Sequence, residues 1–213
     1  MGNPTVPVRL RKGLGIFLAL VGATGFLAGF YLASGADQAA LRSVELPLSD
    51  IQDMAVDSQG RTYLASAFYS RIQRYDAQGR FQLGWAAQSE GGPLTVALKG
   101  NDTIVSEAER RGSLLLFDLD GHLLAERPST TPTSWPMGES VTAERPDGSH
   151  LFLRRGTLSS TIVRDSAGVI APLIVGPRYL RYLGGFPAFL LFAAGMVLYW
   201  GGFPTRMRQS AAT

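Results

Sequence analysis

Residues 51–85 read IQDMAVDSQGRTYLASAFYSRIQRYDAQGRFQLGW, and this stretch decides the fold. Short apolar runs alternate in it with two turn sequences, DSQG at 57–60 and DAQG at 76–79. The side chain of an aspartate in a turn accepts hydrogen bonds from nearby backbone, and glycine adopts positive φ at little cost. The stretch is therefore predicted to form four short antiparallel strands that are joined by tight turns.

The same pattern recurs twice further along the chain. The second copy aligns TIVSEA, at 103–108, with TYLASA of the first copy, and the third copy is weaker. Each copy carries a D-x-x-G turn, and periods of about 40–50 residues with four strands each are typical of propeller blades. The predicted repeats cover residues 46–85, 93–126 and 139–172.

The order of these motifs resembles one blade of a β-propeller of the NHL-repeat type. The first copy carries the resemblance with R-x-Y-x-A in one strand and R-I-x-R-Y-D-x-x-G-x-F in the next hairpin. The resemblance implies a mainly β extramembrane domain, built as a partial propeller of three four-stranded antiparallel units. Closed propellers have about 4–8 blades, so three blades leave open faces that need a cover.

Three arrangements would cover the open faces. A second copy of the chain could close a six-bladed ring, a different protein could bind there, or the copies could curl into a smaller sandwich. A covering partner or a compact β domain is favoured at this point.

Two long apolar runs flank the repeats, 21 residues at 13–33 and 22 residues at 182–203, and neither contains a charge. Each is long enough for a helix to cross a hydrocarbon core of about 30 Å. A cleavable signal peptide ending near Ser34-Gly35-Ala36 is the alternative for the first run, but signal peptides have a shorter apolar region of about 7–15 residues. The predicted segments are a tail at 1–12, a transmembrane helix at 13–34, the β domain at 35–178, a second transmembrane helix at 179–203 and a tail at 204–213.

Charge predicts the topology of the two helices. All 17 acidic residues of the chain lie between Asp37 and Asp165, a span that holds 13 of the 20 basic residues and is net negative. Lysine and arginine near the ends of membrane helices mark the cytoplasmic side. We expect a two-pass protein of the bacterial inner membrane, with both termini cytoplasmic and the central domain periplasmic. The outer ends carry Arg9, Arg11, Lys12, Arg206 and Arg208, and the expected aromatic interface anchors are Tyr31, Tyr182, Tyr199 and Trp200.

Small residues and tryptophans are the candidate contact sites. Gly25, Gly29 and Ala33 form a small-residue series at a spacing of four, which lets helix backbones approach closely in lipid. Trp135 lies in the Pro-, Ser- and Thr-rich loop at 128–138, where it either folds back on a blade or anchors a partner. Trp135 and Trp85 are the predicted interaction residues of the domain surface.

No motif in the sequence predicts a reaction. The chain has no cysteine, and its two histidines, His122 and His150, have no metal-binding neighbour at helical spacing. The basic residues do not form one face on the domain, so nucleic acid is not an expected partner. No catalytic, cofactor or metal residue is predicted, although lipid or pigment from partner subunits could lie against the chain.

The sequence thus predicts a protein that is not an enzyme. It would be an accessory or structural subunit of a larger bacterial membrane complex, respiratory or photosynthetic, whose β domain caps or braces the periplasmic face. The expected partners are other membrane proteins, the lipid bilayer and, as a further candidate, a second copy of the chain. The alternatives are a membrane-anchored periplasmic ligand-binding or sensor module, and a homodimer that closes a six-bladed propeller.

Overall fold

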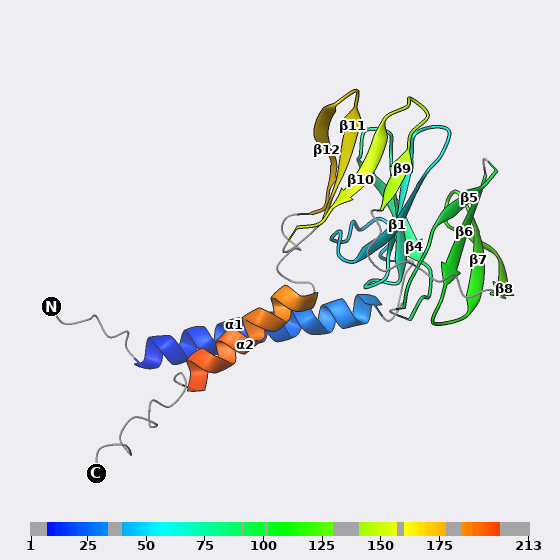
Figure 1. Cartoon of the computed structure of the whole chain (residues 1–213). Helices are drawn as coiled ribbons and strands as arrows, with labels where there is room; N and C mark the ends of the chain where they lie inside the picture. The colour runs from blue at the N-terminus through cyan, green and yellow to red at the C-terminus, as the bar shows by residue number, and fades with distance from the viewer. Residues whose placement is uncertain are drawn as a thin grey trace, which may run out of the picture. The chain divides into compact units, whose positions relative to one another are not determined.

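The computed structural model describes residues 8–33, 40–90, 92–100, 102–129, 141–156, 160–177 and 185–200 (Figure 1). The chain divides into two compact units, residues 31–181 and a second unit made of 1–30 with 182–213. Within the described residues the larger unit is entirely β, and the smaller one consists of two helices. Each unit is described by itself below.

The β unit contains three four-stranded antiparallel sheets, each with its strands in consecutive order. Sheet 1 consists of β1 (Ile51–Val56), β2 (Thr62–Ser66), β3 (Arg71–Tyr75) and β4 (Phe81–Ala86). Sheet 2 consists of β5 (Ala97–Lys99), β6 (Thr103–Ala108), β7 (Ser113–Asp118) and β8 (Leu123–Pro128). Sheet 3 consists of β9 (Thr142–Glu144), β10 (His150–Arg154), β11 (Thr161–Ser166) and β12 (Val169–Val175). The prediction of a mainly β domain with propeller-like blades is confirmed.

The predicted turns form as expected. In sheet 1 the carboxylate of Asp76 accepts hydrogen bonds from the backbone N–H groups of Gln78 and Arg80, both at 2.9 Å. Gly79 has a φ of 79°, a conformation that costs a residue with a Cβ about 1–2 kcal/mol. The glycines of the other D-x-x-G turns, Gly60, Gly121 and Gly168, also have positive φ, and so does Gly148 in the turn RPDG at 145–148.

The register of the second repeat differs by one residue from the sequence alignment. In sheet 1, Thr62 pairs with Tyr75. In sheet 2, Phe117 is the equivalent of Tyr75, and it pairs with Ile104 rather than with Thr103, which the sequence alignment matches to Thr62. The cause is the first turn of the repeat, since Val56 pairs with Thr62 but Lys99 pairs with Thr103 across a shorter loop. A shift of one residue exchanges the two faces of a strand, so the correction decides which side chains of β6 face the core.

Sheet 1 lies between the other two sheets (Figure 1). Its two faces carry alternating residues of each strand. One face, here called the leading face, carries Leu64, Gln73 and Tyr75 and packs against Leu151 and Ile162 of sheet 3. The strands β2 and β3 are buried throughout because both of their faces are covered.

The opposite face of sheet 1, the trailing face, packs against sheet 2. It carries Tyr63, Ile72 and Trp85, which share a buried cluster with Ile104 and Phe117 of sheet 2. The order of the sheets in space is therefore 3–1–2, while the order along the chain is 1–2–3. Short-range patterns in the sequence do not encode this stacking order.

The helical unit is an antiparallel pair, α1 (Val8–Ala33) and α2 (Gly185–Trp200) (Figure 1). A Cβ added at Gly22 would come closer than 3.0 Å to the backbone of Ala188 and Phe192, and one added at Gly15 would do the same at Gly195 and Tyr199. Small residues thus bring the two backbones into contact, as in close-packed membrane helices. Gly25 is also buried, while the surroundings of Gly29 and Ala33 lie outside the described side chains, so the contact predicted for that series stays a prediction.

Only one stretch of the described residues, Arg9–Ala28 in α1, is long and apolar enough to cross a membrane. The apolar part of α2, Ala188–Trp200, is shorter. The prediction of two transmembrane helices is therefore not confirmed.

The helix contact predicts the outcome of a matched pair of substitutions. Gly22→Leu is expected to separate α1 from α2, because its side chain has no room beside the backbone of Phe192. Gly13→Leu in the same helix is the control, since a Cβ there meets nothing within 4 Å. The measurement is an SDS titration of the full chain in mild detergent, in which the midpoint for the loss of helical content is determined. Equal midpoints for the two variants would contradict the contact.

Candidate functional site

Sheet 1 contains polar side chains that are buried or partly buried, and Asp53 is one of them. Its carboxylate accepts backbone N–H groups of Met54 and of Val96, both at 2.8 Å. Burial raises the pKa of Asp53 to about 6, and the two hydrogen bonds oppose that rise. One carboxylate oxygen accepts from the adjacent residue of β1 and the other from Val96, in the segment that precedes β5, so Asp53 links sheet 1 to sheet 2.

Arg71 is another buried candidate. It is 1% exposed and donates to the carbonyl oxygens of Leu41, at 2.6 Å, and Val44, at 3.3 Å. Burial lowers the pKa of Arg71 to about 10. The neighbouring Gln73 exchanges hydrogen bonds with the backbone of Leu46. These two side chains hold the segment before β1 across the leading face of sheet 1, which is a structural task.

The two histidines lie on the surface. The Nδ1 atom of His122 is 2.8 Å from a carboxylate oxygen of Asp118 in the same turn, and His150 begins β10 as an exposed residue. Among the residues that the structure describes, no three His, Asp or Glu side chains gather into a group that could hold a metal ion. The predicted absence of catalytic, metal and cofactor residues stays a prediction.

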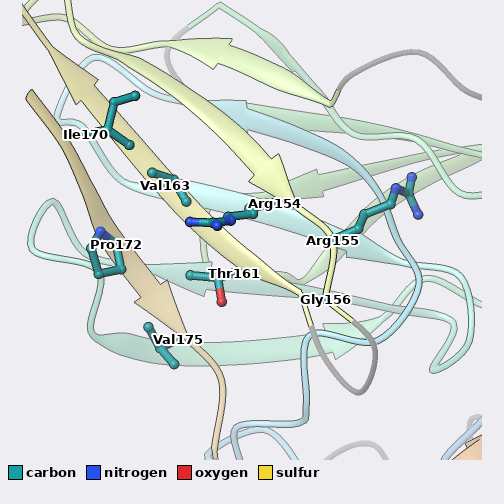
Figure 2. Close-up of a pocket in the computed structure, with 8 residues that line it drawn as sticks. All are labelled: Arg154, Arg155, Gly156, Thr161, Val163, Ile170, Pro172 and Val175. Atoms are coloured by element: carbon teal, nitrogen blue, oxygen red, sulfur yellow. The ribbon is translucent and has the colours of Figure 1, made fainter. Parts of the chain in front are cut away.

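Among the described residues, no element covers the outer face of sheet 3, the side turned away from sheet 1. A hollow of about 360 Å³ lies on it. Figure 2 shows its lining residues, with Arg154 beside Val163 and Thr161 while Arg155 points away. Ile170 at its edge is 61% exposed. The outer face of sheet 3 is defined here by Phe152, Arg154, Thr161, Val163, Ile170, Pro172 and Val175.

Sheet 2 has a similar open side. Its buried side chains face sheet 1, so the alternate residues of β6 and β7 face outward and are only partly buried. Three of them are aliphatic, and Glu107 is an acid among them. The outer face of sheet 2 is defined here by Val105, Glu107, Leu114, Leu116 and Ala125.

Sequence reasoning predicted open blade faces but did not identify the residues that form them, although one signal was present. Leu114, Leu115 and Leu116 are consecutive, so β7 carries leucine on both of its sides. A strand with a continuous apolar run is typical of a sheet that is covered on both faces. Among the residues that the structure describes, sheet 2 is covered on one face only.

The predicted surface tryptophans have different outcomes. Trp85 is 4% exposed and packs between sheets 1 and 2, with its ring 6.4 Å from Tyr63 and 6.0 Å from Phe117. It is therefore a core residue, and its prediction as a surface contact is wrong. Trp135 lies outside the described residues.

The predicted membrane-interface residues are described in part. In α1, Tyr31 is 55% exposed, and in α2, Tyr199 and Trp200 are 39% and 75% exposed. Of the topology residues, Arg9, Arg11 and Lys12 lie in the first turns of α1. The remaining three, Tyr182, Arg206 and Arg208, lie outside the described residues. Nothing in the structure tests the interface or topology roles.

Comparisons with known proteins identify the fold only. No family model matches the sequence, and no curated protein matches it. A streptogramin B lyase structure is 16% identical, with a TM-score of 0.37 over 62% of this chain and 43% of that one. Virginiamycin B lyase from Staphylococcus aureus is 14% identical, with a TM-score of 0.35 over 62% of this chain and 44% of that one. Regucalcin, a calcium-binding protein from Agrobacterium tumefaciens, is 18% identical, with a TM-score of 0.29 over 61% and 44%.

These neighbours are propeller-type folds, in agreement with the three sheets described above, and the chain spans less than half of each. The NHL assignment of the repeats is not confirmed by them. Lyases are among these neighbours, which goes against the prediction that the chain is not an enzyme. That prediction is withdrawn.

Proposed function

We propose that the chain is a membrane-anchored subunit of a larger bacterial membrane assembly, in which its β domain is the part that binds protein. The observation that carries this proposal is the pair of open outer faces on sheets 2 and 3. Aliphatic side chains of β7 and β12 stand on these faces without a covering element among the described residues. Contiguous exposed apolar surface in a soluble domain is typical of protein interaction sites.

The proposal includes the finer assignments made from the sequence. The repeats are NHL-type blades, and the runs at 13–33 and 182–203 are two transmembrane helices with both termini in the cytoplasm. The β domain would then lie in the periplasm and cap or brace the outer face of its assembly. The tight glycine contact between α1 and α2 supports a helical hairpin as the anchor.

The test is extraction of the tagged chain from its native membranes in mild detergent, followed by native gel and mass spectrometry of the band. The expected result is migration with other membrane proteins at constant stoichiometry. Leu114→Arg, on the outer face of sheet 2, should release them. The control is Gln59→Arg, which lies in the exposed β1–β2 turn away from both outer faces and should not. A band that contains this chain alone would refute the proposed function.

A further inference from the structure

The outer face of sheet 2 is a trailing face, and the outer face of sheet 3 is a leading face. This follows when equivalent residues of the three sheets are identified from their turns. In sheet 1, Asp76 donates its N–H to the carbonyl of Arg80, and in sheet 2 Asp118 does the same with His122. Phe117 of sheet 2 therefore takes the place of Tyr75 of sheet 1, and both lie on leading faces. The leading face of sheet 2 packs on the trailing face of sheet 1, which leaves the trailing face of sheet 2 open.

Sheet 3 is matched in the same way. In its last hairpin the pair next to the turn is Ser166 and Val169, so the residue before Ser166, Asp165, is equivalent to Tyr75 of sheet 1. Three residues earlier in each strand, Ile162 is then equivalent to Ile72. Ile162 is a trailing-face residue, and it packs on the leading face of sheet 1. The face left open on sheet 3 is its leading face, with Thr161 and Val163.

Both contacts inside the chain thus join a trailing face to a leading face. The array 3–1–2 begins with an open leading face and ends with an open trailing face. A second copy offers both missing faces at once, whereas an unrelated partner would have to imitate each of them. Two copies in the order 3–1–2–3–1–2 make six blades, which is within the usual range of about 4–8 for closed propellers.

We infer that the occupant of the two outer faces is a second copy of this chain, with the outer face of sheet 2 of one copy packed on the outer face of sheet 3 of the other. This inference deepens the proposed function and rests on it, since it names the partner of the same faces. The two-fold axis would coincide with the ring axis, so both copies would present their membrane anchors on the same side of the ring. The dimer interface is isologous, and it consists of two equivalent contacts between sheet 2 of one copy and sheet 3 of the other.

One pair of charged residues on the two faces is placed to match across the contact. In the contact between sheets 1 and 2, Ala65 on the trailing face and Ala108 on the leading face belong to one buried cluster. Glu107 of sheet 2 is equivalent to Ala65 of sheet 1. Arg154, the last residue of β10 in sheet 3, is equivalent to Ala108 of sheet 2. The same geometry between copies would set the acid of one chain beside the guanidinium of the other, and the leucines of β7 over the hollow of Figure 2.

Because the chain has no cysteine, the contact can be tested by one engineered pair, Glu107→Cys with Arg154→Cys, in the full chain in mild detergent. Oxidation is expected to give a covalent dimer on a non-reducing gel, and each single-cysteine variant should stay a monomer. A cross-link within one chain, a ladder beyond the dimer, or no cross-link would each overturn the inference.

A second measurement does not depend on disulfide geometry. Light scattering should give the wild-type chain a polypeptide mass twice its 22.9 kDa, and Ile170→Arg should halve that mass. Ile170 is 61% exposed, so this substitution leaves the core intact. Gln59→Arg is the matched control and should keep the dimer. A wild-type monomer would overturn the inference.

The two proposals fail separately. A monomer in detergent that still migrates with other proteins from native membranes keeps the proposed function and removes the second copy. A cross-linked dimer that migrates alone keeps the second copy and removes the larger assembly.

Discussion

Replacing Trp85 by alanine is expected to lower the free energy of unfolding of the β domain by about 3–5 kcal/mol, the usual cost of removing a large aromatic side chain from a core. The indole is 4% exposed and lies between sheets 1 and 2, against Tyr63 and Phe117. Its loss leaves a cavity between two sheets that share no hydrogen-bonded strand pair, so the gap closes only by moving one sheet.

The measurement is urea unfolding of the full chain in nonionic detergent, followed by circular dichroism in the β region. Trp200→Ala is the control, because Trp200 is 75% exposed on α2, in the other unit. An unchanged midpoint for Trp85→Ala would show that sheets 1 and 2 do not pack as described.

Gly79→Ala is expected to be more destabilising than Gly168→Ala by about 1–3 kcal/mol, the usual cost of overpacking a core. Both glycines end D-x-x-G turns and have nearly equal φ values of 79° and 83°, so the backbone penalty is shared. They differ in their surroundings. A Cβ at Gly79 would come closer than 3.0 Å to the carbonyl oxygen of Leu173 in sheet 3, whereas a Cβ at Gly168 meets nothing within 4 Å.

The same unfolding assay decides between the two variants. Equal losses of stability would mean that the turn of sheet 1 does not touch β12, and the position of sheet 3 on sheet 1 would then be wrong. The pair of glycines therefore tests the stacking order 3–1–2 without any change in the number of charges.

The strands and turns of this domain could be predicted from the sequence because they depend on local chemistry. Asp76 and Gly79 set their turn through hydrogen bonds and φ within four residues, and the alternation of β6 follows from its own side chains. The face of β6 was assigned wrongly because the loop before it is shorter than its counterpart in sheet 1. Length differences of this kind are invisible to an alignment that matches residue types.

The candidate surfaces were harder to predict from the sequence than the strands and turns. Whether Trp85 faces solvent or a neighbouring sheet depends on which sheet stacks on β4, and that contact joins residues far apart in the chain. The same holds for the open faces, which exist because sheet 3 packs on sheet 1 and not on sheet 2. Leu114 and Leu116 signalled a covered face, but the sequence did not say what covers it.

The central place of sheet 1 has a consequence for how the chain reaches its native state during synthesis. Sheet 1 is made first, yet the part of its leading face that packs on sheet 3 stays uncovered until β10–β12 have left the ribosome. The N–H of Ser160 bonds the carbonyl of Leu48, and Arg145 bonds the carbonyl of Ala77. Contacts of such long sequence separation form slowly, because the intervening loop must close before they stabilise the fold. The most buried sheet thus waits for part of its cover, and the nascent chain exposes Leu64 and Tyr75 on this face while the residues up to 175 are being made.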